Sequence, residues 1–140
     1  MKIISKKISS LVIILCALLQ LDVKAQTKDS SMTALQPKLI TLNLDSSVYQ
    51  EIFNGPPTTV GMYSGLVTLE PAETVGHHNT DEYEEILVIF SGEGQMTFAD
   101  GQIFNLEYGV IAYCPPHTEH DVKNISAIPL KYIYIASETK

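Results

Sequence analysis

The sequence predicts an all-β protein built as an antiparallel sandwich or barrel. Short apolar runs, rich in β-branched and aromatic residues, recur at a spacing of about 8 to 12 residues between turn residues. An Asp100-Gly101 pair stands between two such runs, which is the strongest short signal for a β-hairpin in the chain. The sequence shows no convincing apolar period for a helix longer than about one or two turns. Together these three observations define the fold class.

Length, composition and charge narrow the class of protein further. The chain has 140 residues, of which 45% are hydrophobic and 18% are charged. This length fits one domain, and this composition is typical of a folded globular chain. The net charge is -7 and every basic residue is a lysine. A nucleic-acid partner would need a basic stripe that the sequence lacks, and an anionic membrane surface is disfavoured for the same reason.

Residues 1–25 have the pattern of a secretory signal peptide. A lysine-rich start precedes an apolar stretch at residues 8–21, and Val23 and Ala25 place small side chains before a cleavage site at Gln26. The apolar stretch is shorter than the roughly 20 residues that span a bilayer. An uncleaved amino-terminal anchor is the alternative. We expect an exported protein, periplasmic or extracellular, without membrane attachment after cleavage.

The remaining chain divides into a polar linker at residues 26–37 and a β-domain at residues 38–140. Cleavage leaves five lysines and fifteen acidic residues, so the exported protein is strongly acidic. It also removes Cys16 and leaves Cys114 as the only cysteine. A lone thiol closes no internal disulfide, so we expect Cys114 to be a small buried hydrophobe and packing to hold the domain together.

In the first half of the domain, residues 38–44 alternate in the manner of a half-buried strand. Residues 47–53 are ambiguous and could form one helical turn. Gly55, Pro56 and Pro57 indicate a loop, and residues 61–70 form the next predicted strand.

In the second half, residues 85–90 are continuously apolar and end at a Ser-Gly pair, which predicts a buried strand. Tyr132 and Tyr134 alternate with isoleucines, so we expect them in the core or in a pocket wall. Five further strands complete the prediction, at residues 95–99, 102–106, 110–114, 120–125 and 130–136.

The four histidines fall into two clusters, His77 with His78 and His117 with His120. Each cluster stands near the start of a predicted strand. In a β-barrel, two such segments can face each other across the interior, where imidazoles and carboxylates converge as metal ligands or as a buried acid–base pair. Four loop histidines without a shared site are the alternative, and the clustering alone leaves it open.

The second cluster resembles the second sequence motif of the cupin family. Gly109, Pro115, His120 and Asn124 take the motif positions, while His117 stands where the motif has a glycine. This match is the more specific half of a resemblance that covers roughly residues 60–136.

The first cluster resembles the first cupin motif. Three positions of this motif are occupied by His78, Glu85 and Gly92. The motif also has a pair of histidines, and Thr80 stands in place of the second one. Ala72 stands where the motif begins with a glycine.

The resemblance implies a cupin-type antiparallel jelly-roll β-barrel with a divalent metal bound by His78, Glu85 and His120. Two imidazoles and a carboxylate suit Fe, Mn or Zn and leave coordination positions open. Thr80 is a poor ligand, so it implies a weaker metal site or none, and it would instead be a pocket hydroxyl. We expect His77 and His117 at the rim or beside the site, where either could replace the missing ligand.

Three hypotheses of function follow. The first is a metal-dependent enzyme that acts on a small polar molecule by oxidative or isomerising chemistry, with no catalytic residue assigned. The second is a non-catalytic binder of a small, sugar-like ligand without metal. The third is a structural or dimerisation module, and a homodimer stays open under each. As an alternative to metal binding, Glu85 could form an ion pair with Lys123 or Lys131.

Overall fold

The computed structural model describes residues 35–139. The predicted signal peptide, most of the predicted linker and Cys16 lie outside these residues. Between residues 35 and 139, no helix has the length and apolar character needed to cross a membrane.

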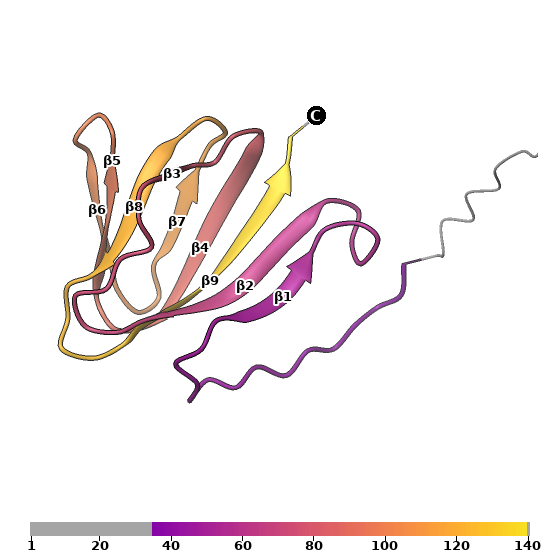
Figure 1. Ribbon diagram of the computed structural model, residues 1–140, viewed down its shortest axis with the longest axis horizontal. Helices are drawn as coiled ribbons and strands as arrows, with labels where there is room; N and C mark the ends of the chain where they lie inside the picture. The colour runs from indigo at the N-terminus through magenta and orange to yellow at the C-terminus, as the bar shows by residue number, and fades with distance from the viewer. Residues whose placement is uncertain (1–34, 140) are drawn as a thin grey trace, which may run out of the picture. The chain divides into compact units, whose positions relative to one another are not determined.

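The described residues form two antiparallel sheets that lie as two layers (Figure 1). One sheet has five strands in the order β1-β2-β9-β4-β7, and the other has four in the order β3-β8-β5-β6. This arrangement confirms the predicted antiparallel all-β class. The strands are β1 (Gln50–Asn54), β2 (Met62–Leu69), β3 (His78–Asn79), β4 (Tyr83–Ser91), β5 (Gly94–Phe98), β6 (Ile103–Leu106), β7 (Ile111–Cys114), β8 (Glu119–Asn124) and β9 (Leu130–Glu138).

The Asp-Gly signal marks the hairpin between β5 and β6. Gly101 has a φ of 87°, in the left-handed region that favours glycine, and its amide donates to the carbonyl of Phe98 at 2.9 Å. The Asp100 carboxylate accepts from the amide of Gln102 at 2.9 Å. The prediction of this hairpin is confirmed.

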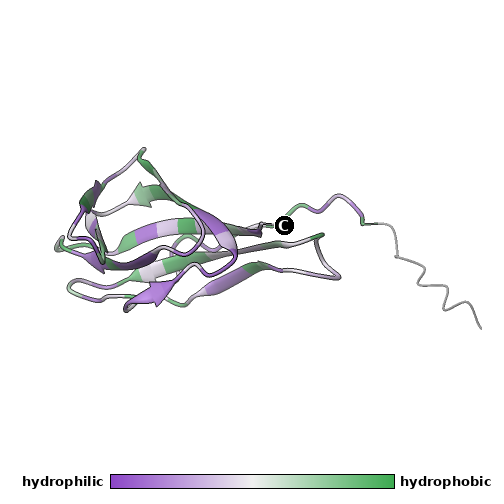
Figure 2. Ribbon diagram, turned by 90° about the horizontal axis from the view of Figure 1, so that it is seen from above, coloured by the Kyte–Doolittle hydropathy of each residue, from purple (hydrophilic) through white to green (hydrophobic). Residues whose placement is uncertain are grey.

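The core lies between the two sheets. Side chains alternate along the strands, so apolar and polar residues follow each other as bands of different colour in Figure 2. Burial of one large apolar side chain contributes about 1.5–3 kcal/mol, so this layer holds the sheets together. Cys114 is fully buried within it, as expected. The other buried core residues are Leu69, Leu87, Ile89, Met96, Leu106, Ala112, Val122, Leu130 and Tyr132.

The prediction of a strand at residues 38–44 is wrong. The segment has no strand pairing, and Leu39 is 97% exposed. Ile40 and Leu42 instead line a groove of about 270 Å³ together with Ile133 and Ile135. The apolar alternation therefore comes from an extended segment whose alternate side chains lie against the sheet. Such a segment has the two-residue period of a strand but forms no backbone hydrogen bonds with a neighbouring strand.

Two other elements differ from the prediction. The ambiguous stretch at residues 47–53 contains no helical turn; its second half is strand β1, which pairs with β2. The short strand β3 went unpredicted, because two residues are too few to show an alternation.

Asn124, the last residue of β8, is fully buried and holds the end of the barrel. Its amide donates to the carbonyls of Leu69 at 2.9 Å and Ile128 at 2.8 Å. Its side-chain oxygen accepts from the Ser126 amide at 2.8 Å. The motif asparagine is therefore a structural residue that satisfies buried backbone groups.

Candidate functional site

His78, Glu85 and His120 converge at one place between the sheets. Each offers one ligand atom, and these atoms lie within 4.8 Å of one another. His78 on β3 is the direct cross-strand partner of His120 on β8, and their ring centroids are 4.3 Å apart. Glu85 comes from β4 in the other sheet, and its Oε2 is 3.4 Å from the Nε2 of His120. The structure thus brings together the three residues that the resemblance implied as ligands.

Backbone carbonyls orient both imidazoles. The Nδ1 of His78 is 2.9 Å from the carbonyl oxygen of Gly76, and the Nδ1 of His120 is 3.4 Å from that of Thr118. A carbonyl oxygen can only accept a hydrogen bond, so each Nδ1 carries the hydrogen. The Nε2 atom of each ring is then available to the cluster as a ligand atom. Metal-binding histidines use this same support, in which the second ring nitrogen donates to a fixed acceptor.

The cluster runs from the surface into the interior. His78 is exposed, while the side chains of Glu85 and His120 are 13% and 1% exposed. Burial lowers the pKa of His120, but the neighbouring Cys114 sulfur and Glu85 carboxylate outweigh it and raise this pKa to about 10. Without a metal, His120 therefore keeps a proton that a metal ion would have to displace.

The cluster forms part of the wall of a pocket of about 570 Å³. Residues of both sheets line it, so the pocket lies between the layers. Of its sixteen lining residues, six are aliphatic and four are tyrosines. Besides His78, Glu85 and His120, the lining comprises Tyr49, Val67, Thr68, Leu69, Val75, Asn79, Thr80, Tyr83, Leu87, Val122, Tyr132, Tyr134 and Ala136.

Thr80 lies in the pocket wall, but its hydroxyl is occupied. The Oγ1 donates to the carbonyl of Pro115 at 2.8 Å and accepts from the amide of Thr118 at 2.9 Å. Thr80 is buried, and these bonds connect the turn before β4 to the loop before β8. The side chain therefore joins two loops and is not the free pocket hydroxyl that the motif position suggested.

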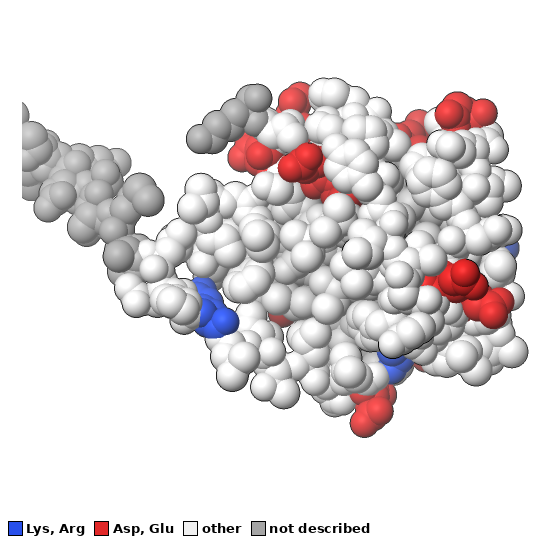
Figure 3. Space-filling model, turned by 180° about the vertical axis from the view of Figure 1, so that it is seen from behind, with Lys and Arg blue, Asp and Glu red and all other residues white. Residues whose placement is uncertain are grey.

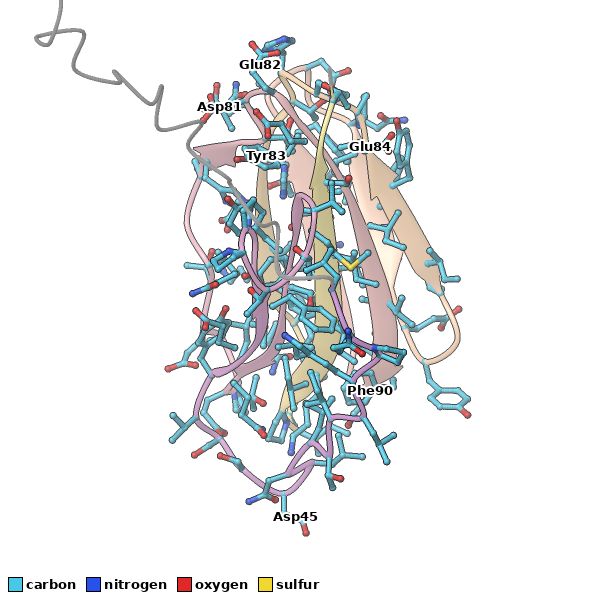
Figure 4. The ribbon with its side chains drawn as sticks, turned by 90° about the vertical axis from the view of Figure 1, so that its right-hand side faces the viewer. Asp45, Asp81, Glu82, Tyr83, Glu84 and Phe90 are labelled. Carbon is cyan, nitrogen blue, oxygen red and sulfur yellow. The ribbon has the colours of Figure 1, made fainter. Side chains whose placement is uncertain are left out.

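His77 and His117 are not part of the cluster of ligand atoms found in the described chain. Both are exposed. The Nε2 of His117 is 3.7 Å from the Oε1 of Glu82, and both side chains are 67% exposed, so this pair contributes little. Glu82 lies with Asp81 and Tyr83 at one end of the molecule, opposite Asp45 (Figure 4).

No lysine of the described residues forms an ion pair with Glu85. The ammonium group of Lys131 instead donates to the carbonyl of Leu44. Acidic side chains are spread over the face shown in Figure 3 and lysines are sparse there, in keeping with the net charge of -7.

Sequence reasoning placed Tyr132 and Tyr134 in the core or a pocket wall, and both line the pocket. Tyr49 was missed. It precedes β1 in a stretch without a clear period, and only its contacts across the fold place it beside the pocket.

Comparison with known proteins agrees with the fold and the motifs. Residues 65–136, about half of the chain, match the cupin domain family. A solved RmlC-like cupin with a double-stranded β-helix fold, from Methanocaldococcus jannaschii, is similar at a TM-score of 0.63 and 21% identity, covering 73% of this chain and 91% of that chain. A Cupin 2 conserved barrel domain protein from Salinispora arenicola is similar at a TM-score of 0.61 and 18% identity, with 74% and 91% covered.

A curated relative, an uncharacterised protein of Methanocaldococcus jannaschii, is 42% identical over 50 residues. The alignment spans 36% of this chain and 39% of that protein, so it covers well under two thirds of the relative. The solved cupin domain of Schizosaccharomyces pombe Cnp3 is similar at a TM-score of 0.59 and 14% identity, over 65% of this chain and 64% of that chain. The two-layered antiparallel fold, the two histidine segments and the family match lead to one assignment: the chain belongs to the cupin domain family.

Proposed function

We propose that His78, Glu85 and His120 bind a divalent transition metal ion and that the adjoining pocket presents a small molecule to it. The observation that carries this proposal is the set of ligand atoms within 4.8 Å, two imidazole nitrogens and one carboxylate oxygen. When two histidines and a carboxylate bind one side of a metal ion, the remaining coordination positions are open to water or to a ligand.

The chemistry of the donors fits Fe(II), Mn(II) or Zn(II). The backbone carbonyls that hold each Nδ1 fix the imidazoles before an ion arrives, which lowers the cost of ordering them. When bound, such an ion supplies a Lewis acid, and Fe or Mn would supply redox chemistry as well. Oxidative or isomerising chemistry on the pocket's ligand is the activity that this arrangement supports.

The pocket walls narrow the kind of ligand. Val67, Leu69 and Val122 are apolar, and tyrosine hydroxyls are the main polar groups away from the cluster. Such a lining suits a small molecule with an apolar body and few polar groups better than a sugar, whose many hydroxyls would lose water without gaining partners. We therefore narrow the small polar molecule of the sequence analysis to an amphipathic one.

A metal-free binding protein is the second candidate, and one observation favours it. The Nε2 of His120 and the Oε2 of Glu85 are 3.4 Å apart and already neutralise each other as a protonated imidazole and a carboxylate. The cluster therefore needs no ion to be stable. Thr80, which stands where the family motif has a histidine, weakens the case for a metal further.

Elemental analysis and zinc titration of the purified protein decide between the two candidates. We expect about one transition metal ion per chain and its loss in His120→Ala, because only three strong ligands are present. His77→Ala is the matched control and should keep the ion, because His77 lies outside the cluster. A folded protein that takes up no zinc, or equal losses in both variants, would reject the metal site.

A further inference from the structure

Two tyrosine hydroxyls meet at the pocket, away from the histidine cluster. The hydroxyl oxygens of Tyr49 and Tyr134 are 2.9 Å apart, a normal hydrogen bond. Both residues line the same pocket as His78, Glu85 and His120. The proposed function uses neither hydroxyl.

Gly65 makes room for Tyr49. On the inner face of β2, Gly65 is the direct partner of Tyr134 on β9. A Cβ at position 65 would lie 2.5 Å from the ring of Tyr49, too close for any side chain. The Tyr49 ring therefore fills the space that a side chain at residue 65 would otherwise take, and this brings its hydroxyl to Tyr134.

The segment that carries Tyr49 is fastened on both sides of the residue. The Thr68 hydroxyl donates to the carbonyl of Ser46 at 3.3 Å, and Lys131 donates to the carbonyl of Leu44. Strand β1 begins directly after Tyr49. Residue 49 also lies outside the part of the chain that matches the cupin domain family. The hydroxyl pair thus joins a tyrosine of the family-matched segment to one on a tethered segment outside it.

The pair lies within reach of a small molecule at the metal cluster. Glu85 pairs with Ala136 on β9, so Tyr134 is its diagonal neighbour on the same face of the sheet. Diagonal neighbours on adjacent strands are about 7–8 Å apart, about the length of one substituted aromatic ring. The small side chain of Ala136 leaves the space in front of Glu85 open.

We propose that the Tyr49–Tyr134 hydroxyl pair determines which ligand the pocket selects. The ligand class is a small aromatic or short apolar molecule with an oxygen donor at the cluster and a hydrogen-bond acceptor, such as a ketone or amide oxygen, at the opposite end. This inference deepens the proposed function and rests on it for the orientation of the ligand.

The chemistry of paired phenols explains the preference for an acceptor. When one tyrosine donates to the other, the second hydroxyl keeps its own hydrogen and offers it to the pocket. Polarisation along the pair strengthens that donor. Burial, the bond to Tyr49 and the Glu85 carboxylate raise the pKa of Tyr134, so the phenol remains protonated at neutral pH. An apolar group at this position would leave the donor without a partner.

A matched pair of catechols tests the proposal. The probes 3,4-dihydroxyphenylacetone and 4-propylcatechol carry chelating ends of nearly equal acidity, because a methylene group separates the ketone from the ring, and they differ in the ketone oxygen. We expect zinc-loaded wild-type protein to bind the ketone about three- to tenfold more tightly than the alkylcatechol, as measured by calorimetry. This ratio corresponds to the free energy of one hydrogen bond. Tyr49→Phe and Tyr134→Phe should each bring the ratio close to one. Gly65→Ala should do the same, because its Cβ displaces the ring of Tyr49.

The controls separate this inference from the metal site. Tyr108→Phe changes an 80% exposed tyrosine outside the pocket and should keep the ketone preference. Zinc affinity should be equal in Tyr49→Phe and wild type. A ketone preference that Tyr49→Phe leaves intact, or no saturable binding of either catechol, would overturn the inference. A preference that persists without zinc and disappears in Tyr49→Phe would support the hydroxyl pair while rejecting the metal's part in the proposed function.

Discussion

Ala72 and His117 adopt the left-handed backbone conformation, with φ of 68° and 58°. Both stand where the cupin motifs have a glycine, and a side chain in this conformation costs about 1–2 kcal/mol. Both positions therefore hold a backbone conformation that favours glycine, although neither residue is a glycine.

His117→Gly should stabilise the protein by about 0.5–1 kcal/mol, because relief of strain outweighs the added freedom of the unfolded chain. Loss of the exposed contact with Glu82 should subtract little. Urea unfolding would measure the change. His117→Ala keeps the strained conformation, so a comparable gain in that variant would contradict the explanation.

At the scale of single residues, the motif spacing predicts the cluster well. Glu85 and Gly92 fix the register of the first motif, and this register selects His78 over His77. The role of Thr80 was not predictable, because its partners Pro115 and Thr118 are distant in sequence. Tyr49 was unpredictable for the same reason, since the space above Gly65 exists only in the folded sheet.

At the scale of elements, Thr80 connects the two segments that carry the histidines. Thr80→Val would leave the Pro115 carbonyl and the Thr118 amide without their partner at a buried position. We expect a loss of about 1–3 kcal/mol in the free energy of unfolding, measured with urea. Thr80→Ser retains the hydroxyl and should lose much less. A larger loss in Thr80→Ser than in Thr80→Val would show that the methyl group, and not the hydroxyl, holds the loops.

The longer apolar strands were predictable, whereas β1, the two-residue strand β3 and the unpaired segment at residues 38–44 were not. The strands β4 and β9 follow predicted apolar runs and extend them by a few residues at their ends. Residues 38–44 show the same alternation but lie on a sheet as an extended segment. Alternation of apolar and polar residues indicates which side chains face an apolar surface. It does not indicate whether the backbone pairs with a neighbouring strand.

At the scale of the whole molecule, the cluster joins the two layers. His78 and His120 belong to the four-stranded sheet and Glu85 to the five-stranded sheet. An ion bound there would connect both sheets, so its binding free energy would add to the stability of the fold.

The pH dependence of stability should differ between the metal-free and metal-loaded protein. The pKa of His120 is about 10 in the folded chain against 6.5 for an unperturbed imidazole. Protonated His120 therefore stabilises the metal-free protein fully below pH 6.5, and this stabilisation is lost as the pH rises towards 10. A metal needs the deprotonated imidazole, so metal-derived stability should instead grow with pH.

Thermal unfolding of EDTA-treated protein between pH 6 and 10 would measure this decline. Glu85→Gln removes the carboxylate that favours the protonated imidazole, so the decline should be smaller in that variant. A wild-type protein whose metal-free stability changes no more than that of Glu85→Gln would refute the coupling between these two residues.

The contact between Tyr49 and Gly65 has a consequence for how related sequences can diverge. The two positions share one volume, so a larger residue at 65 requires a smaller one at 49, and neither can change freely alone. Homologues should therefore show compensating substitutions at these positions. Position 49 lies outside the family-matched segment, so ligand preference could drift through the amino-terminal stretch while the three cluster residues stay fixed.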